Sequence, residues 1–176
     1  SNPLDRCGIC KHEIMGELLD YSIREGCDVL ADGSMPEDRG DHRPGILAAD
    51  RLGVWHPLME AGMTKGVARR VLKERCISTH DRPSTTCLMT RIPYGEQITM
   101  EKLEIIERIE SILRENGFRE IRLRLHESPR DGHIGVLEVD DPDRAVAIWK
   151  DMNIFEDGVK LTIDPLGYRQ GSLNRP

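Results

Sequence analysis

The sequence lacks long hydrophobic runs and is poor in aromatic residues. No apolar stretch approaches the roughly 20 residues that span a bilayer, and no signal-peptide-like hydrophobic segment is present. Phe, Trp and Tyr together make up 4% of the 176 residues, which leaves few rings to stack on nucleic-acid bases. These absences predict a soluble, cytoplasmic protein with no membrane contact. The length of 176 residues is enough for one domain or two small ones.

An even set of cysteines and a basic balance of charge are also missing. Five cysteines in an acidic chain do not resemble a secreted disulfide framework. The net charge of −6 argues against nucleic acid as a partner, because broad nucleic-acid binding requires positive charge. In a reducing compartment, a C-x-x-C pair is more typical of a metal or catalytic site than of a structural disulfide.

The first half of the chain alternates helical and extended patterns. Helical periodicity runs over residues 11–25 and ends at Gly26, and the apolar run 27–31 then enters a turn-rich acidic loop. Further helices are expected at 44–52 and after Thr64. This alternation predicts a partial Rossmann-like parallel α/β sheet over residues 1–96, with loops at the strand ends.

The second half, residues 97–176, has a different order of elements. The pattern predicts a helix, two strands, a helix and a last strand, at 99–117, 119–126, 133–139, 141–155 and 159–164. That order is a small α+β domain of the αββαβ type. A boundary is expected near residue 96.

Cys7 and Cys10, in DRCGICK, are expected just before the first helix. A thioredoxin-like redox pair would follow a strand directly, and no strand is predicted there. Structural zinc requires four ligands, but a second C-x-x-C or a closely spaced His pair is absent. Three cysteines with one open coordination position suit a catalytic [4Fe–4S] cluster.

Cys87 is the best candidate for the third ligand. It lies in a polar, proline-bounded loop near Arg82 and Arg91, an electropositive setting, although an ordinary loop thiol explains it equally well. Cys27 and Cys76 have apolar neighbours and are interpreted as small buried hydrophobic residues.

Several strings resemble successive motifs of the LarE family. They are DRCGICK, DGS followed by DRGDHRPG, PL followed by AGMTK, PSTTCLMTRIPYGE, and LTIDPLGYRQGSLN. LarE proteins are ATP-dependent sulfur transferases of the PP-loop pyrophosphatase superfamily that help to build the nickel-pincer cofactor. The similarity runs in order from about Asn2 to Asn174, and the motif around Cys87 is the most specific.

The resemblance implies roles for three thiols. Cys87 matches the cysteine that donates its own sulfur in sacrificial family members. In a second group, a C-x-x-C placed like Cys7 and Cys10 joins that cysteine to hold a [4Fe–4S] cluster. The resemblance therefore favours the cluster-dependent group, with ATP and Mg²⁺ as cofactors of the complete enzyme, a pyridinium mononucleotide as substrate, and a homo-oligomeric assembly.

The resemblance also assigns arginines. Arg122 and Arg124 match an R-x-R pair that contacts phosphate in the family, whereas the pattern alone predicts a half-buried strand with a solvated basic face. Arg91 is expected to bind phosphate likewise, or to pair with a local carboxylate. Asp38 and Asp41 either hold Mg²⁺ or belong to a solvated acidic loop.

The sequence departs from the family in one respect. The PP-loop, a Ser-Gly-Gly-x-Asp-Ser run, is absent, and in the family it lies upstream of the point where this chain begins. It is therefore expected on a separate polypeptide, or it has been removed, or the activity is lost. Two alternatives stay open: a tRNA-thiolating relative, and a non-catalytic zinc module that uses Cys7, Cys10, Cys87 and His80.

Overall fold

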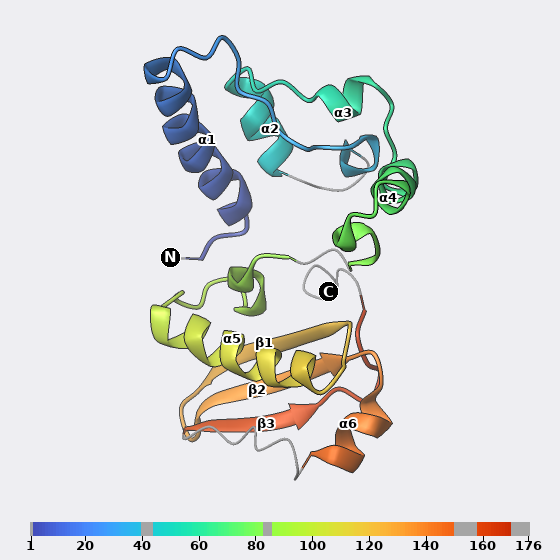
Figure 1. The fold of residues 1–176 in the computed structure, drawn as a ribbon. Helices are drawn as coiled ribbons and strands as arrows, with labels where there is room; N and C mark the ends of the chain where they lie inside the picture. The colour runs from blue at the N-terminus through green and yellow to red at the C-terminus, as the bar shows by residue number, and fades with distance from the viewer. Residues whose placement is uncertain (1, 40–43, 83–85, 150–157, 170–176) are drawn as a thin grey trace. The chain divides into compact units, whose positions relative to one another are not determined.

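The computed structural model describes residues 2–39, 44–82, 86–149 and 158–169 (Figure 1). Contacts divide the chain into two compact units. One is Leu4–Arg82, and the other joins Ser1–Pro3 to Pro83–Pro176. The boundary expected near residue 96 lies within the second of these units.

The unit Leu4–Arg82 is helical in its described parts. A small core forms where Met15, Ala49 and Val54 pack together. The α-helices are α1 (Arg6–Arg24), α2 (Pro44–Arg51), α3 (Pro57–Glu60) and α4 (Lys65–Glu74), and the 3-10 helices are η1 (Pro36–Arg39) and η2 (Ser78–Asp81).

Helix α1 begins earlier than predicted, so Cys7 and Cys10 lie inside it rather than before it. Helix α2 packs closely against α1 at Gly8. A Cβ added to Gly8 would lie 3.2 Å from the Pro44 side chain. The end of the helix is as predicted, since α1 ends at Arg24 and Gly26, two residues later, adopts a φ of 72°.

The parallel sheet predicted for residues 1–96 is not found among the described residues of Leu4–Arg82. Their strand pairing is limited to one parallel bridge between Ala31 and Trp55. The amide of Trp55 donates to the Leu30 carbonyl at 2.8 Å, and the amide of Asp32 donates to the Trp55 carbonyl at 3.0 Å. The apolar run 27–31 therefore forms no buried strand of a sheet. Val29 within it is 53% exposed, and no further strand adjoins this run among the described residues.

The second unit confirms the predicted αββαβ order. Its sheet has the order β1-β2-β3, antiparallel between β1 and β2 and parallel between β2 and β3. Helix α5 lies across one face of this sheet (Figure 1). The elements are α5 (Met100–Glu115), β1 (Ile121–Ser128), β2 (Gly132–Val139), α6 (Pro142–Ile148) and β3 (Val159–Ile163).

The caps of α5 and α6 match the sequence. The Thr99 hydroxyl accepts from the Lys102 amide, and Asp141 accepts from the Arg144 amide. Gly117 follows α5 with a φ of 82°. The predicted helix 141–155 ends at Ile148 in the structure, and its last residues lie outside the described range.

No helix in the described ranges is both long and apolar enough to cross a bilayer.

The main core of the second unit lies between α5 and the sheet. It contains Ile106, Ile109, Leu113, Leu123 and Leu137, each nearly inaccessible to solvent.

Candidate functional site

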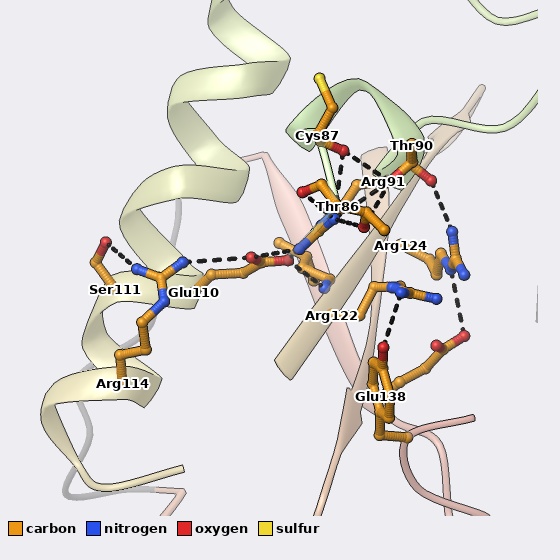
Figure 2. Close-up of polar contacts among 12 residues, drawn as sticks. Thr86, Cys87, Thr90, Arg91, Glu110, Ser111, Arg114, Arg122, Arg124 and Glu138 are labelled. Carbon is orange, nitrogen blue, oxygen red and sulfur yellow. Dashed lines mark hydrogen bonds and ion pairs between the residues drawn. The ribbon is translucent and has the colours of Figure 1, made fainter. Parts of the chain in front are cut away.

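Cys87 stands at the start of the short 3-10 helix η3 (Leu88–Arg91). Its carbonyl oxygen accepts from the Thr90 amide at 2.9 Å and from the Thr90 hydroxyl at 2.7 Å. The residue is exposed, and Figure 2 shows its sulfur directed away from the Arg91 guanidinium. The turn is therefore held through its backbone while the thiol stays at the surface.

Arg91 and Glu110 form a buried ion pair beneath this turn (Figure 2). Nε of Arg91 lies 2.8 Å from Oε1 of Glu110, and Nη2 lies 3.0 Å from Oε2. Arg91 is 4% exposed and Glu110 1%. Of the two expectations for Arg91, the structure therefore contains the local carboxylate partner. Phosphate contact by Arg91 stays a prediction.

The third nitrogen of Arg91 faces the cysteine turn. Nη1 donates to the Thr86 carbonyl at 3.0 Å, to the Thr86 hydroxyl, and to the Cys87 carbonyl at 3.3 Å. One guanidinium thus connects the carboxylate of Glu110 on α5 to the backbone carbonyls of Thr86 and Cys87.

Glu110 was not anticipated from the sequence. It lies on the inner face of α5 with Ile106, Ile109 and Leu113. The sequence feature that could have identified it is a carboxylate at a position where the helical period calls for an apolar residue. Its Oε1 also accepts from the backbone amide of Leu123 at 3.0 Å. Because β1 is an edge strand, this carboxylate takes the place of a neighbouring strand at that amide.

Arg122 and Arg124 are 6% and 5% exposed, so the expected solvated basic face is wrong. Nη1 of Arg124 donates to the Thr90 carbonyl at 2.7 Å, and Nε donates to Glu138 at 3.3 Å. Burial lowers the pKa of the Arg124 guanidinium; Glu138 opposes this shift, and the positive charge of Arg122 adds to it. The guanidinium of Arg124 therefore contacts the 3-10 helix η3 through Thr90.

Arg122 differs from Arg124 in its partners. Glu138 stands opposite Arg122 in the strand register, yet Nη2 of Arg122 donates to the Tyr168 hydroxyl at 3.0 Å. The guanidinium carbon lies 4.8 Å from the centre of the Tyr168 ring. Nε of Arg122 is buried and has no hydrogen-bond partner among the described residues. This arginine therefore has an unused donor.

Two cavities in the described structure lie away from these arginines. One of about 400 Å³ is lined by residues around Trp55 and His56, and one of about 600 Å³ lies beside Trp149 and Leu161. Neither cavity is lined by Arg122 or Arg124.

Cys7 and Cys10 are one helical turn apart on α1, so they share a face of that helix. Cys7 is exposed and Cys10 half-buried, and neither forms a disulfide. They lie in the first unit and Cys87 lies in the second. No three His, Cys, Asp or Glu side chains come together as a metal site within the described ranges. Joint ligation by these three thiols stays a prediction.

Cys27 and Cys76 are exposed, contrary to the expectation that they are buried. Cys76 follows the end of α4 with a φ of 54°, the left-handed conformation that usually requires glycine. Its amide donates to the Lys73 carbonyl at 3.0 Å, as in a helix-terminating turn. The apolar neighbours of Cys76 therefore gave the wrong signal, because the residue terminates a helix.

A second polar cluster was also missed. Nδ1 of His56 lies 2.6 Å from Asp32, and its Nε2 lies 3.1 Å from Asp50. Lys11 pairs with the other oxygen of Asp32 at 3.2 Å. Burial favours the neutral acid of Asp32, but hydrogen bonds from Ser34, His56 and Lys11 outweigh it and hold the pKa of Asp32 well below its usual range.

The proposed magnesium ligands are described only in part. Asp38 forms an ion pair with Lys65 at 3.0 Å and accepts from the Met35 amide at 3.0 Å. Asp41 lies outside the described residues, and so do Ser84 and Thr85 of the cysteine motif. Magnesium binding at this loop therefore stays a prediction.

The chain matches no protein-family model. Over 99% of its length it is 32% identical to an uncharacterised protein of Synechocystis, covering 66% of that protein. Over 80% of its length it is 28% identical to an uncharacterised protein of Methanocaldococcus jannaschii, covering 53% of it.

A third relative has a named activity. This is the pyridinium-3,5-bisthiocarboxylic acid mononucleotide synthase of Lactiplantibacillus plantarum, LarE, to which the chain is 25% identical over 174 residues. The match covers 99% of the chain and 59% of the relative, so the chain spans between about half and two thirds of the lengths of these curated proteins. Along nearly its whole length, the chain is a distant homologue of LarE.

Proposed function

We propose that this chain is the sulfur-donor part of an ATP-dependent sulfurtransferase of nickel-pincer cofactor synthesis. Its acceptor is a carboxylate of a pyridinium mononucleotide that ATP has activated by adenylylation. Homology to LarE supports the substrate class. The observation that carries the proposal is the exposed Cys87 on a turn held from below by the buried Arg91–Glu110 pair.

The chemistry requires a sulfur nucleophile near an activated acyl carbon. A carboxylate oxygen first displaces pyrophosphate from ATP and forms the acyl adenylate. Sulfur then attacks the acyl carbon, a carbon–sulfur bond forms, and adenylate leaves with the electron pair of the broken carbon–oxygen bond. The fixed backbone around Cys87 would position the sulfur source for this attack.

The cysteine chemistry fits a [4Fe–4S] cluster on Cys7, Cys10 and Cys87. All three are reduced cysteines, and Cys7 and Cys10 share one face of α1. Three thiolate ligands leave one iron open, and when bound the cluster would supply sulfide for transfer. The chain's own contribution is to present the ligands and to hold the mononucleotide.

The arginines support a phosphate contact. Arg91, Arg122 and Arg124 are buried together with two buried carboxylates, Glu110 and Glu138, so positive charge is in excess. Arg122 is the one of these three cations with an unsatisfied Nε among the described residues. A phosphate monoester matches both the charge and the missing acceptor.

Nucleotide activation would need the PP-loop that this sequence lacks. We propose that a PP-loop-bearing segment, on a separate polypeptide or on a longer form of the chain, supplies the ATP and Mg²⁺ site. No glycine-rich phosphate loop occurs in these 176 residues, so the chain by itself should bind ATP weakly.

The test is sulfur transfer itself. The chain, combined with its PP-loop segment under anaerobic conditions, should thiolate an adenylylated pyridinium mononucleotide, detected by the mass increase of the product. Cys87→Ala should abolish the transfer, while Cys27→Ala, a matched change of another exposed cysteine, should retain it. Full activity in the Cys87→Ala protein would refute the proposal.

A further inference from the structure

The segment that follows β3 stays hydrogen-bonded to β2. The amide of Asp164 donates to the Leu137 carbonyl at 2.8 Å, and the amide of Tyr168 donates to the Val139 carbonyl at 2.8 Å. Between them, the Gly167 amide donates to the Asp164 carbonyl at 3.0 Å. These bonds form a tight turn over residues 164–168 and fix the backbone position of Tyr168.

Gly167 makes this turn possible. Its φ is 67°, and a Cβ added there would lie 2.8 Å from the Val139 carbonyl oxygen and 3.3 Å from Pro142. Asp164 closes the turn further, because its Oδ1 accepts from the Leu166 amide at 2.8 Å. The turn that places Tyr168 beside Arg122 therefore depends on glycine at position 167.

The Tyr168 hydroxyl has a donor to spare. It accepts from Nη2 of Arg122, and a phenol that accepts one hydrogen bond keeps its own hydrogen for another acceptor. A hydroxyl that accepts from a cation is polarised and donates more strongly. Tyr168 is half-buried, whereas Arg122 is 6% exposed, so the tyrosine is the more accessible residue of the pair.

We propose that Tyr168 and Arg122 together form the phosphate-binding unit for the mononucleotide. Arg122 supplies the positive charge and holds the ring, and the Tyr168 hydroxyl donates a hydrogen bond to a phosphate oxygen. The inference rests on the proposed function, which it deepens by naming a residue of the C-terminal segment as a phosphate ligand. It also gives the pair a specificity role, since a riboside without phosphate has no group for it to bind.

The test uses Tyr168→Phe, which keeps the ring over Arg122 and removes only the hydroxyl. Nicotinic acid mononucleotide and its dephosphorylated riboside are titrated into the full chain by calorimetry. Loss of one hydrogen bond to a charged group should weaken mononucleotide binding about tenfold and leave riboside binding unchanged. Tyr21→Phe, at an exposed position on α1, is the matched control and should change neither affinity.

The outcomes separate the two proposals. Equal mononucleotide affinity in Tyr168→Phe and in the unchanged chain, with a loss in Arg122→Ala, would overturn the role of Tyr168 and keep the phosphate site. Equal affinity of the unchanged chain for mononucleotide and riboside would refute the phosphate site itself. A loss for both ligands in Tyr168→Phe would assign the residue to folding instead.

Discussion

The carboxylate of Glu110 accepts two hydrogen bonds from Arg91, and both side chains are nearly inaccessible to solvent. Removing one partner of such a pair leaves the other charge buried without compensation. Glu110→Gln should therefore lower the free energy of unfolding by about 3 kcal/mol. Urea denaturation measures this, with Glu107→Gln on the exposed face of α5 as control. Equal losses in the two variants would contradict the assignment.

The turn at Gly167 gives a second prediction. Gly167→Ala places a Cβ against the Val139 carbonyl at a left-handed position, so we expect a loss of about 1–3 kcal/mol in unfolding free energy. Gly16→Ala, on α1 with open space around it, should be neutral or slightly stabilising. An unchanged midpoint in Gly167→Ala would show that the turn is not constrained in this way.

Cys76 offers a stabilising substitution. Because it holds a φ of 54° after α4 and is exposed, Cys76→Gly should raise the unfolding free energy by about 0.5–1 kcal/mol. Cys27→Gly, at the other exposed cysteine that follows a helix, should bring no such gain because its φ is not positive. Thermal unfolding of both variants decides the matter, and a lower midpoint for Cys76→Gly would disprove the strain.

Asp32 sets an acid limit on stability. Its pKa is lowered in the folded chain, so its contribution is complete above the ordinary Asp pKa of about 3.9 and is lost as the pH falls below that value. The free energy of unfolding should therefore decrease between about pH 4 and pH 2, and Asp32→Asn should flatten this part of the profile. Asp28→Asn, at an exposed carboxylate nearby, is the control. An unchanged slope in Asp32→Asn would count against the cluster around His56.

The second unit could be predicted because its signals are local. Alternation in β1, the period of α5, and the caps Thr99 and Asp141 depend on neighbours within a few residues. The parallel sheet of residues 1–96 failed because an apolar run such as 27–31 shows only that a segment is extended or buried. It does not supply the neighbouring strands that a sheet requires.

The site was predicted only in part, because local motifs can be recognised in the sequence but contacts between distant residues cannot. Motifs pointed to Cys87 and Arg91, but the partner of Arg91 lies 19 positions away on another element, and spacing alone does not select Glu110. The Arg122–Tyr168 contact spans 46 positions and depends on a turn at Gly167. Such pairs arise from tertiary packing, which residue patterns do not encode directly.

We propose that Cys7, Cys10 and Cys87 hold one [4Fe–4S] cluster from which sulfur is transferred. The most direct measurement is iron content together with visible absorption of anaerobically reconstituted protein. We expect about four irons per chain and a brown protein, with both lost in Cys87→Ala and retained in Cys27→Ala. A colourless zinc protein, or a full cluster in Cys87→Ala, would contradict it.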